Sequence, residues 1–173
     1  MSEFLLAAYN REDAAAYALS VLRAHSDDLP LDLDSTAIVR VGEDGRYTVT
    51  TTGGAGTRRT TSGVLWGALF ELVFLVPVAG VAYGSRVGGM FGALDRAGLD
   101  ADVRARMRDV LGPRTSGLAF FGIDMDPEPA LRQLSVAPTS VLRAALSPEL
   151  DEELVWELGG VPLNEQESSA RST

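Results

Sequence analysis

Three small groups of residues in the chain have types that could perform chemistry. His25 is the only histidine, so a catalytic triad would need every other partner to converge on it. Asp124 and Asp126 resemble half of a carboxylate metal site, but no third ligand follows at a matching spacing. The run Gly53–Gly56 lacks the lysine of a phosphate-binding loop. We therefore expect a protein that is not an enzyme and that binds no cofactor and no metal.

A fourth candidate is Glu71, because it is a carboxylate inside an apolar run. In a helix it would share a row with Gly63 and Gly67, which lie at four-residue spacing before it. An acid in apolar surroundings has a raised pKa, so Glu71 would titrate or bind a cation. If it instead pairs with Arg86 or lies at a wet edge, its role is structural. Glu71 and Arg86 are thus the candidates for a buried charge, and we favour the structural role.

The composition of the chain limits the classes of partner it can bind and the cellular compartment in which we expect it. The 173 residues have a net charge of −9, and all fifteen basic residues are arginine. Such an acidic chain is not expected to bind nucleic acid, because that function needs a basic face. The absence of cysteine excludes thiol chemistry, disulfides and thiolate metal sites. The N-terminal residues lack the basic start and the cleavage site of a signal peptide, so we expect a cytoplasmic protein.

The stretch that organises the chain is Ser62–Leu94, two apolar helix-length runs on either side of Pro77. Glycines recur in it at four-residue spacing, and on a helix such positions nearly stack. They leave a seam without side chains, along which another helix can approach closely, with Gly67 opposite Gly88. Each glycine costs roughly 0.5–1 kcal/mol relative to alanine, so the repeat needs a packing reason. The predicted seam consists of Gly63, Gly67, Gly80, Gly84, Gly88 and Gly92.

The outer faces of these two helices are apolar and aromatic. Each run is shorter than the roughly 20 residues that a membrane span needs, and charges interrupt both. A hairpin that enters a bilayer part-way, or that packs on other copies of the chain, accommodates them better. The predicted contacts to lipid or to a partner chain are Trp66, Phe70, Phe74, Arg58 and Arg59. The two arginines would lie at the level of lipid headgroups, or in solvent within a flexible segment.

The remaining chain predicts a small α+β domain, residues 1–160, with 62–97 as the inserted helical hairpin and 161–173 as a disordered tail. Its pattern is typical of a ferredoxin-like antiparallel sheet with helices on one face. Asp44 and Gly45 predict a hairpin turn, and Asn10 predicts a helix N-cap. The predicted strands are Glu3–Tyr9, Thr36–Val41, Arg46–Thr51, 118–123 and Val141–Leu146. The predicted helices outside the insert are Arg11–His25, Asp100–Leu111, 126–134 and one that begins after Ser147.

The order of these features resembles the bacterial domain-of-unknown-function family 1269, which comprises proposed membrane proteins of uncharacterised role. The resemblance extends from Glu3 to Leu158. It rests on the segments IVRVGEDGRYTVTTT, GVLWGALFELVFLVP, GVAYGSRVGGMFGAL, GLDADVRARMRDVLGPRTSGLAFF and VLRAALSPELDEEL. It implies a cytoplasmic or membrane-associated protein without known catalytic residues. Glu71 and Arg86 depart from the family pattern, which argues against a hairpin that spans the membrane.

Three functional hypotheses follow. The first is a non-enzymatic, self-associating protein (a homo-oligomer) whose hairpin inserts shallowly into, or lies on, the inner face of the cell membrane. The second is a soluble homo-oligomer in which hairpins from several copies form a shared core. The third is a ligand- or pH-responsive sensor domain in which Glu71 is the responsive group.

Overall fold

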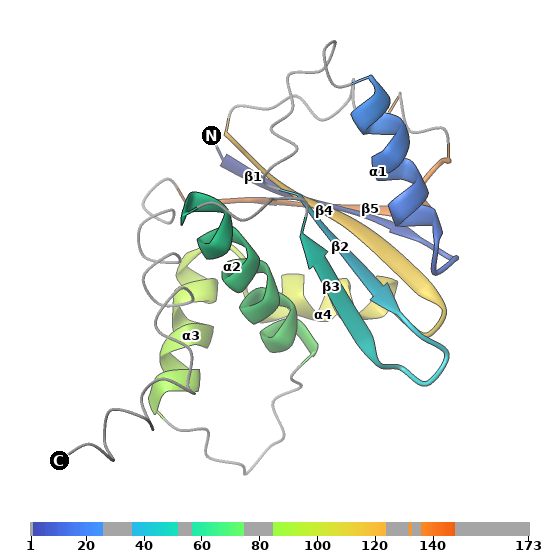
Figure 1. The fold of residues 1–173 in the computed structure, drawn as a ribbon. Coiled ribbons are helices and arrows are strands. Elements are labelled where there is room, and N and C mark those ends of the chain that lie inside the picture. The colour runs from blue at the N-terminus through green and yellow to red at the C-terminus, as the bar shows by residue number, and fades with distance from the viewer. Residues whose placement is uncertain are drawn as a thin grey trace, which may run out of the picture.

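The computed structural model describes residues 2–25, 36–51, 57–74, 85–123, 132 and 136–147. Their strands form an antiparallel sheet in the order β3-β2-β4-β1-β5 (Figure 1). This mixture of helices and an antiparallel sheet confirms the α+β class. The elements in chain order are β1 (Ser2–Tyr9), α1 (Ala14–Ala24), β2 (Thr36–Val41), β3 (Tyr47–Thr51), α2 (Thr57–Phe74), α3 (Ser85–Arg96), α4 (Ala101–Val110), β4 (Thr115–Ile123) and β5 (Ser140–Ala145).

Helices cover both faces of the sheet, so the expectation of helices on one face is wrong. Along β1 the side chains alternate: Phe4 and Leu6 belong to the core under α2, α3 and α4, whereas Leu5 and Ala7 belong to the core under α1 (Figure 1). All four are buried. A strand that is buried on both faces reads as a continuous apolar run, which explains the sequence of β1.

The start of α1 is satisfied by a residue of β4, not by the predicted N-cap Asn10. The helix begins at Ala14, and Asp13 at its N-cap makes no side-chain hydrogen bond to the backbone. Instead, the Ser116 hydroxyl accepts a hydrogen bond from the Ala15 N–H (3.0 Å) and donates one to the carbonyl oxygen of Arg11 (2.6 Å). Ser116 is buried, so this hydroxyl takes the place of a local cap and ties α1 to the sheet.

The predicted hairpin between β2 and β3 is confirmed. The Gly42 N–H donates to the carbonyl oxygen of Arg46 (2.8 Å), and the Asp44 carboxylate accepts from the Arg46 N–H (3.1 Å). Gly45 has a φ of +76°, a conformation that glycine adopts without a steric penalty. The turn chemistry of the sequence therefore sets the register of these two strands.

The other elements agree with the sequence at most positions. The strands β1, β4 and β5 and the helix α4 lie where the sequence predicts them. The segment before the glycine-rich stretch is an exception, because α2 begins at Thr57, whereas the sequence predicts a flexible lead-in there. A helix that is nucleated extends at little further cost, which allows these residues to join it. The predicted helices at 126–134 and after Ser147 lie outside the described residues, apart from Arg132.

Candidate functional site

The aromatic row of α2 packs inside the chain. Trp66 and Phe70 are buried, and their rings lie 6.0 Å apart by centroid. Trp66 also lies 6.3 Å from Phe4 of β1, and the half-buried Phe74 stacks on Tyr47 of β3 at 4.3 Å. The expectation that Trp66 and Phe70 meet lipid or a partner chain is therefore wrong. Residues four apart form one row on a helix, and this row occupies the large apolar face of the sheet.

The glycines of the predicted seam face away from this core wherever the structure describes their surroundings. A Cβ added at Gly67 or at Gly88 would meet no described atom within 4 Å, and at Gly92 it would meet only the Arg96 Nη1, at 3.4 Å. The extended approaches of the α2 backbone are to β3 and α4. Gly67 and Gly88 therefore do not oppose each other closely within the chain. The surroundings of Gly63 in α2 are not described, and Gly80 and Gly84 lie outside the described residues.

The polar helix α4 holds both helices through two arginines. The buried Arg104 donates from Nη1 to the Asp95 carboxylate (2.7 Å) and to the carbonyl oxygen of Leu99 (2.6 Å). Its guanidinium also lies 5.0 Å from the centre of the Phe91 ring. Arg108 donates to the carbonyl oxygen of Val73 (2.8 Å), at the end of α2. Carbonyl groups at a helix C-terminus, such as that of Val73, lack intrahelical donors and attract cations, so arginine suits the position of Arg108.

The end of α3 is fixed by Gly98. The Leu99 N–H donates to the carbonyl oxygen of Leu94 (2.9 Å) and the Gly98 N–H to that of Asp95 (3.2 Å), the two bonds of a Schellman motif. Gly98 has a φ of +89°, and a Cβ there would overlap the carbonyl oxygen of Ala145 in β5. The Ser147 N–H also donates to the carbonyl oxygen of Ala97 (3.3 Å). The turn after α3 is thus packed directly against the end of β5.

The predicted buried charge is not buried. Glu71 is exposed on α2, because its row faces away from the sheet. It nevertheless lies near Tyr47: burial first, and then the negative charge of Glu71, raise the pKa of the Tyr47 hydroxyl. Arg58, Arg59 and Arg86 lie within α2 or α3, but their side chains are outside the described part of the structure. An ion pair between Glu71 and Arg86 therefore stays a prediction.

The remaining candidates form no catalytic constellation among the described residues. His25 is exposed at the end of α1, where its ring Nδ1 lies 2.9 Å from the carbonyl oxygen of Val21. Asp124 and Asp126 lie outside the described residues. Within the part of the chain that the structure describes, no three His, Asp or Glu side chains come together as metal ligands.

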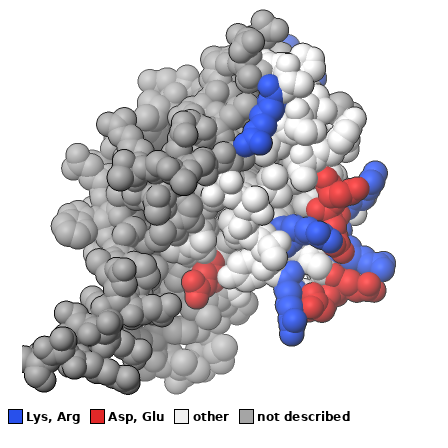
Figure 2. All heavy atoms as spheres, in the orientation of Figure 1, with Lys and Arg blue, Asp and Glu red and all other residues white. Residues whose placement is uncertain are grey.

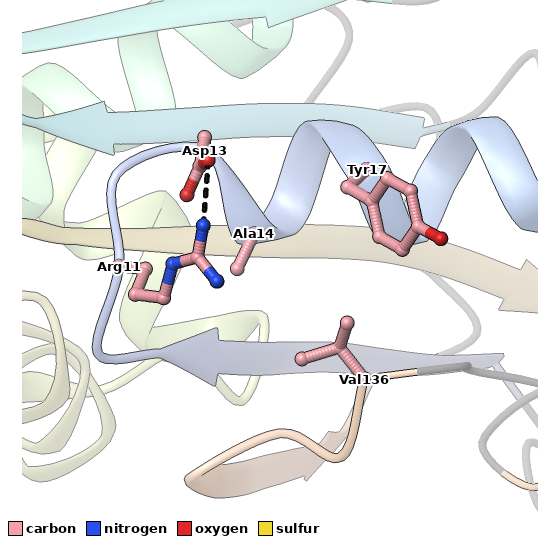
Figure 3. Close-up of a pocket in the computed structure, with 5 residues that line it drawn as sticks. All are labelled: Arg11, Asp13, Ala14, Tyr17 and Val136. Atoms are coloured by element: carbon pink, nitrogen blue, oxygen red, sulfur yellow. Dashed lines mark hydrogen bonds and ion pairs between the residues drawn. The ribbon is translucent and has the colours of Figure 1, made fainter.

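A shallow hollow of about 210 Å³ lies beside the start of α1 (Figure 3). Arg11, Asp13, Ala14, Tyr17 and Val136 line it. Within the hollow, the Arg11 guanidinium pairs with the Asp13 carboxylate, and Nη2 lies 2.9 Å from Oδ2. The charges of this hollow are therefore already matched, and both side chains are exposed to water. A second hollow of about 270 Å³ lies where β1 and α4 end.

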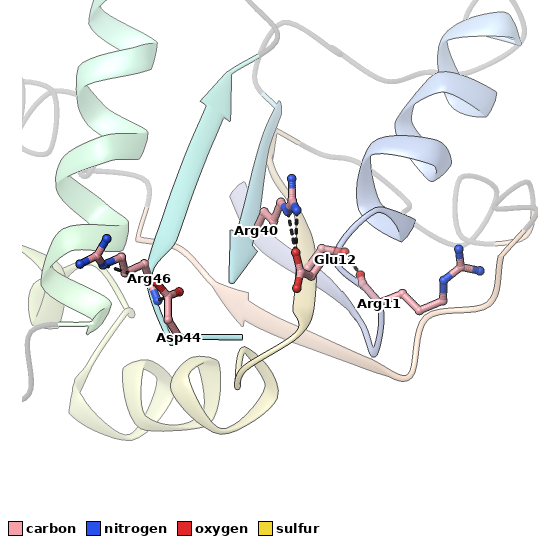
Figure 4. A network of polar contacts seen from close by, with 6 residues as sticks. Arg11, Glu12, Arg40, Asp44 and Arg46 are labelled. Atoms are coloured by element: carbon pink, nitrogen blue, oxygen red, sulfur yellow. Dashed lines mark hydrogen bonds and ion pairs between the residues drawn. The ribbon is translucent and has the colours of Figure 1, made fainter. Parts of the chain in front are cut away.

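Charges of both signs alternate around the turns at one end of the molecule (Figure 2). Arg40 pairs with Glu12 (2.6 Å) and Arg46 with Asp44 (3.4 Å) (Figure 4). Arg114 pairs with Glu43 (3.1 Å). Exposed pairs of this kind contribute about 0–1 kcal/mol each. Among the described residues of the face shown, they form no surface of a single sign.

Two residues that matter for this region were not among those singled out from the sequence. Arg104 lies three residues before Met107 and seven before Leu111, on the apolar face of α4, and this position was the available signal. Gly98 directly follows the last turn of α3, the place where a left-handed glycine commonly ends a helix.

Fold and site define an α+β protein in which an antiparallel sheet carries a helix on one face and a glycine-rich helical pair on the other. A family model described as a protein of unknown function, DUF1269, matches residues 60–159, which is more than half of the 173 residues. The chain belongs to this family. The match includes α3, α4, β4, β5 and nearly all of α2, but it begins well after Glu3, where the resemblance was expected to begin.

Two further comparisons add no relative, since no curated protein and no solved structure matches the chain. Among the described helices, none is both long and apolar enough to cross a membrane.

Proposed function

We propose that the protein is a non-enzymatic, self-associating protein, and that the outward glycines of α2 and α3 form the contact between copies. The observation that carries this proposal is the open space at Gly67 and Gly88. Each glycine weakens its helix by roughly 0.5–1 kcal/mol relative to alanine, and no described contact within the chain makes use of it. A helix of another copy is a partner that can approach such a backbone closely.

A second copy fits this surface better than a lipid bilayer does. The membrane hypothesis relies on Trp66 and Phe70, and both side chains are committed to the core of their own chain. Gly88 and Gly89 are exposed on α3, and glycine offers almost no apolar area to lipid. The same two glycines are well suited to close packing of backbones. Attachment to a membrane through Arg58 and Arg59 is the alternative function that the test below distinguishes from self-association.

The test is light scattering on the full chain without detergent. We expect a particle of several subunits for the unmodified chain, and a smaller particle for Gly67→Leu and for Gly88→Leu. Gly112→Leu is the matched control, because Gly112 also has open space for a Cβ but lies outside the helical pair. Circular dichroism should show an unchanged fold in all three variants.

Two results would contradict the proposal. One is a monomer at every concentration of the unmodified chain, and the other is a particle whose mass neither leucine changes. Flotation with anionic vesicles is the accompanying measurement. If the unmodified chain floats with the vesicles and the double variant Arg58→Ala/Arg59→Ala does not, binding to the membrane surface would replace self-association as the proposed function.

We also propose that the sheet that carries these helices has ferredoxin-like connectivity. Both β1 and β2 are antiparallel to β4, which lies between them, so α1 connects two parallel strands that are separated by a third. This split βαβ arrangement supports a ferredoxin-like core of β5-β1-β4-β2, to which β3 adds an edge strand.

A further inference from the structure

The helix α3 is attached differently from the other helices. The backbone of α2 runs close to β3 and α4, and that of α1 close to β1, β2 and β4. The backbone of α3 makes no comparably extended approach to another described element. It also contains Gly88, Gly89 and Gly92, so its own helix propensity is low. A helix of this kind depends on side-chain contacts to stay formed and in place.

Arg104 supplies three of those contacts. From α4 it reaches the Asp95 carboxylate, the carbonyl oxygen of Leu99 and the face of Phe91, which all lie on α3 or directly after it. The Arg104 side chain is 6% exposed, whereas that of Asp95 is 52% exposed. A buried guanidinium is tolerated only while its partners stay in place. The position of α3 and the burial of this charge are therefore coupled.

We propose that Arg104 is a latch by which α4 holds α3, and that α3 opens as a unit while the sheet stays folded. Opening uncovers the buried Ala93 and Leu94 and the half-buried Phe91, and it returns the Arg104 guanidinium to water. The strands keep their pairing in this open state, because none of their hydrogen bonds involves α3. Elements with few extended contacts are those that open before global unfolding. The latch does not depend on self-association.

Hydrogen exchange on the full chain, read by mass spectrometry, tests the latch. We expect the amides of α3, residues 85–96, to exchange about tenfold faster in Arg104→Met than in the unmodified chain, since charge-assisted hydrogen bonds are lost. The amides of β1 and β4 should exchange as before. Arg106→Met is the matched control, because Arg106 is exposed on the same helix and should leave exchange in α3 unchanged.

Asp95→Asn provides a second variant in case Arg104→Met does not fold. It removes the half-exposed carboxylate, leaves the apolar core intact and should also accelerate exchange selectively in α3. All samples are compared at concentrations that give the same particle mass, so a failure of self-association does not affect the result. Equal acceleration in the sheet and in α3, or none in α3 for either variant, would overturn the latch.

Discussion

The helices on the two faces of the sheet direct their small residues in opposite ways. On α1, the alanines Ala14, Ala15 and Ala18 point into the sheet and are buried there. On α2 and α3, Gly67 and Gly88 point away from it, into space that no described atom of the chain fills. Both patterns bring a backbone within reach of a close neighbour. Small residues on a helix therefore indicate a close approach, but not the side from which it comes.

The two faces also differ in how their helices are fastened. The neutral hydroxyl of Ser116 joins the start of α1 to β4. On the other face, Arg104 joins α4 to Asp95 in the last turn of α3, and Arg108 joins α4 to the end of α2. One helix across the middle of a sheet can be held by its own apolar face. Three helices that share a face must also be held to one another, and α4 does this.

The largest effect on stability is expected at Gly98, the glycine that packs against β5 of its own chain. Gly98→Ala should lower the free energy of unfolding by about 3 kcal/mol, because its φ is positive and its Cβ would overlap the Ala145 carbonyl oxygen. Gly88→Ala is the control within α3, the helix that Gly98 follows, and it should raise the free energy of unfolding by about 0.5–1 kcal/mol. Urea unfolding measures both. Equal effects would mean that Gly88 is also packed within the chain.

A smaller effect on stability should distinguish the α1 face of the sheet from the face that α2 and α3 cover. Ala18→Leu places a large side chain between α1 and the sheet and should cost about 2 kcal/mol of stability. The analogous change Gly88→Leu, on the opposite face, should not lower the stability of the single chain, because the site is open and leucine favours a helix more than glycine does. Thermal unfolding at low concentration measures this pair. If both leucines cost the same, the contrast between inward alanines and outward glycines is wrong.

The smallest effect at neutral pH concerns Tyr9, in the core under α1. Burial raises the pKa of its hydroxyl to about 12 from the usual 10.0, and no described residue hydrogen-bonds to it. Because the folded-state pKa is raised, the stability is present below pH 10 and is lost as the pH rises through about 12. Tyr9→Phe should leave stability at pH 7 nearly unchanged and should reduce this alkaline loss.

The measurement for Tyr9 is the free energy of unfolding between pH 7 and pH 11. Tyr17→Phe is the control, because the Tyr17 ring is 56% exposed and should not change the profile. An alkaline loss as steep in Tyr9→Phe as in the unmodified chain would show that this hydroxyl does not couple to folding.

Much of the local structure could be predicted from the sequence. The strand β1, the hairpin at Asp44–Gly45 and the helix α4 follow from short-range patterns: a continuous apolar run, a turn that needs positive φ, and an acid at a helix start. Each depends on residues that are neighbours in the chain. Such signals do not require knowledge of where the element lies in the fold.

The directions of the side chains could not be predicted in this way. The row of Trp66, Phe70 and Phe74 and the row of Gly67 lie on α2, whose apolar residues are spread around the helix, so periodicity does not say which row faces the core. The sheet decides the matter, because its apolar face takes the largest side chains and leaves the glycines outside.

Local patterns along the chain specify the class of fold, the strands and the presence of two helices rich in glycine. The exposure of Glu71 and the burial of Arg104 depend instead on the packing of distant elements, because burial depends on which elements pack together. Arg104 belongs to a polar helix, so its sequence context predicts an exposed side chain. It is buried because the fold places Asp95 of α3 and the carbonyl oxygen of Leu99 beside it. Long-range packing, which local patterns do not encode, therefore assigns these residues their roles.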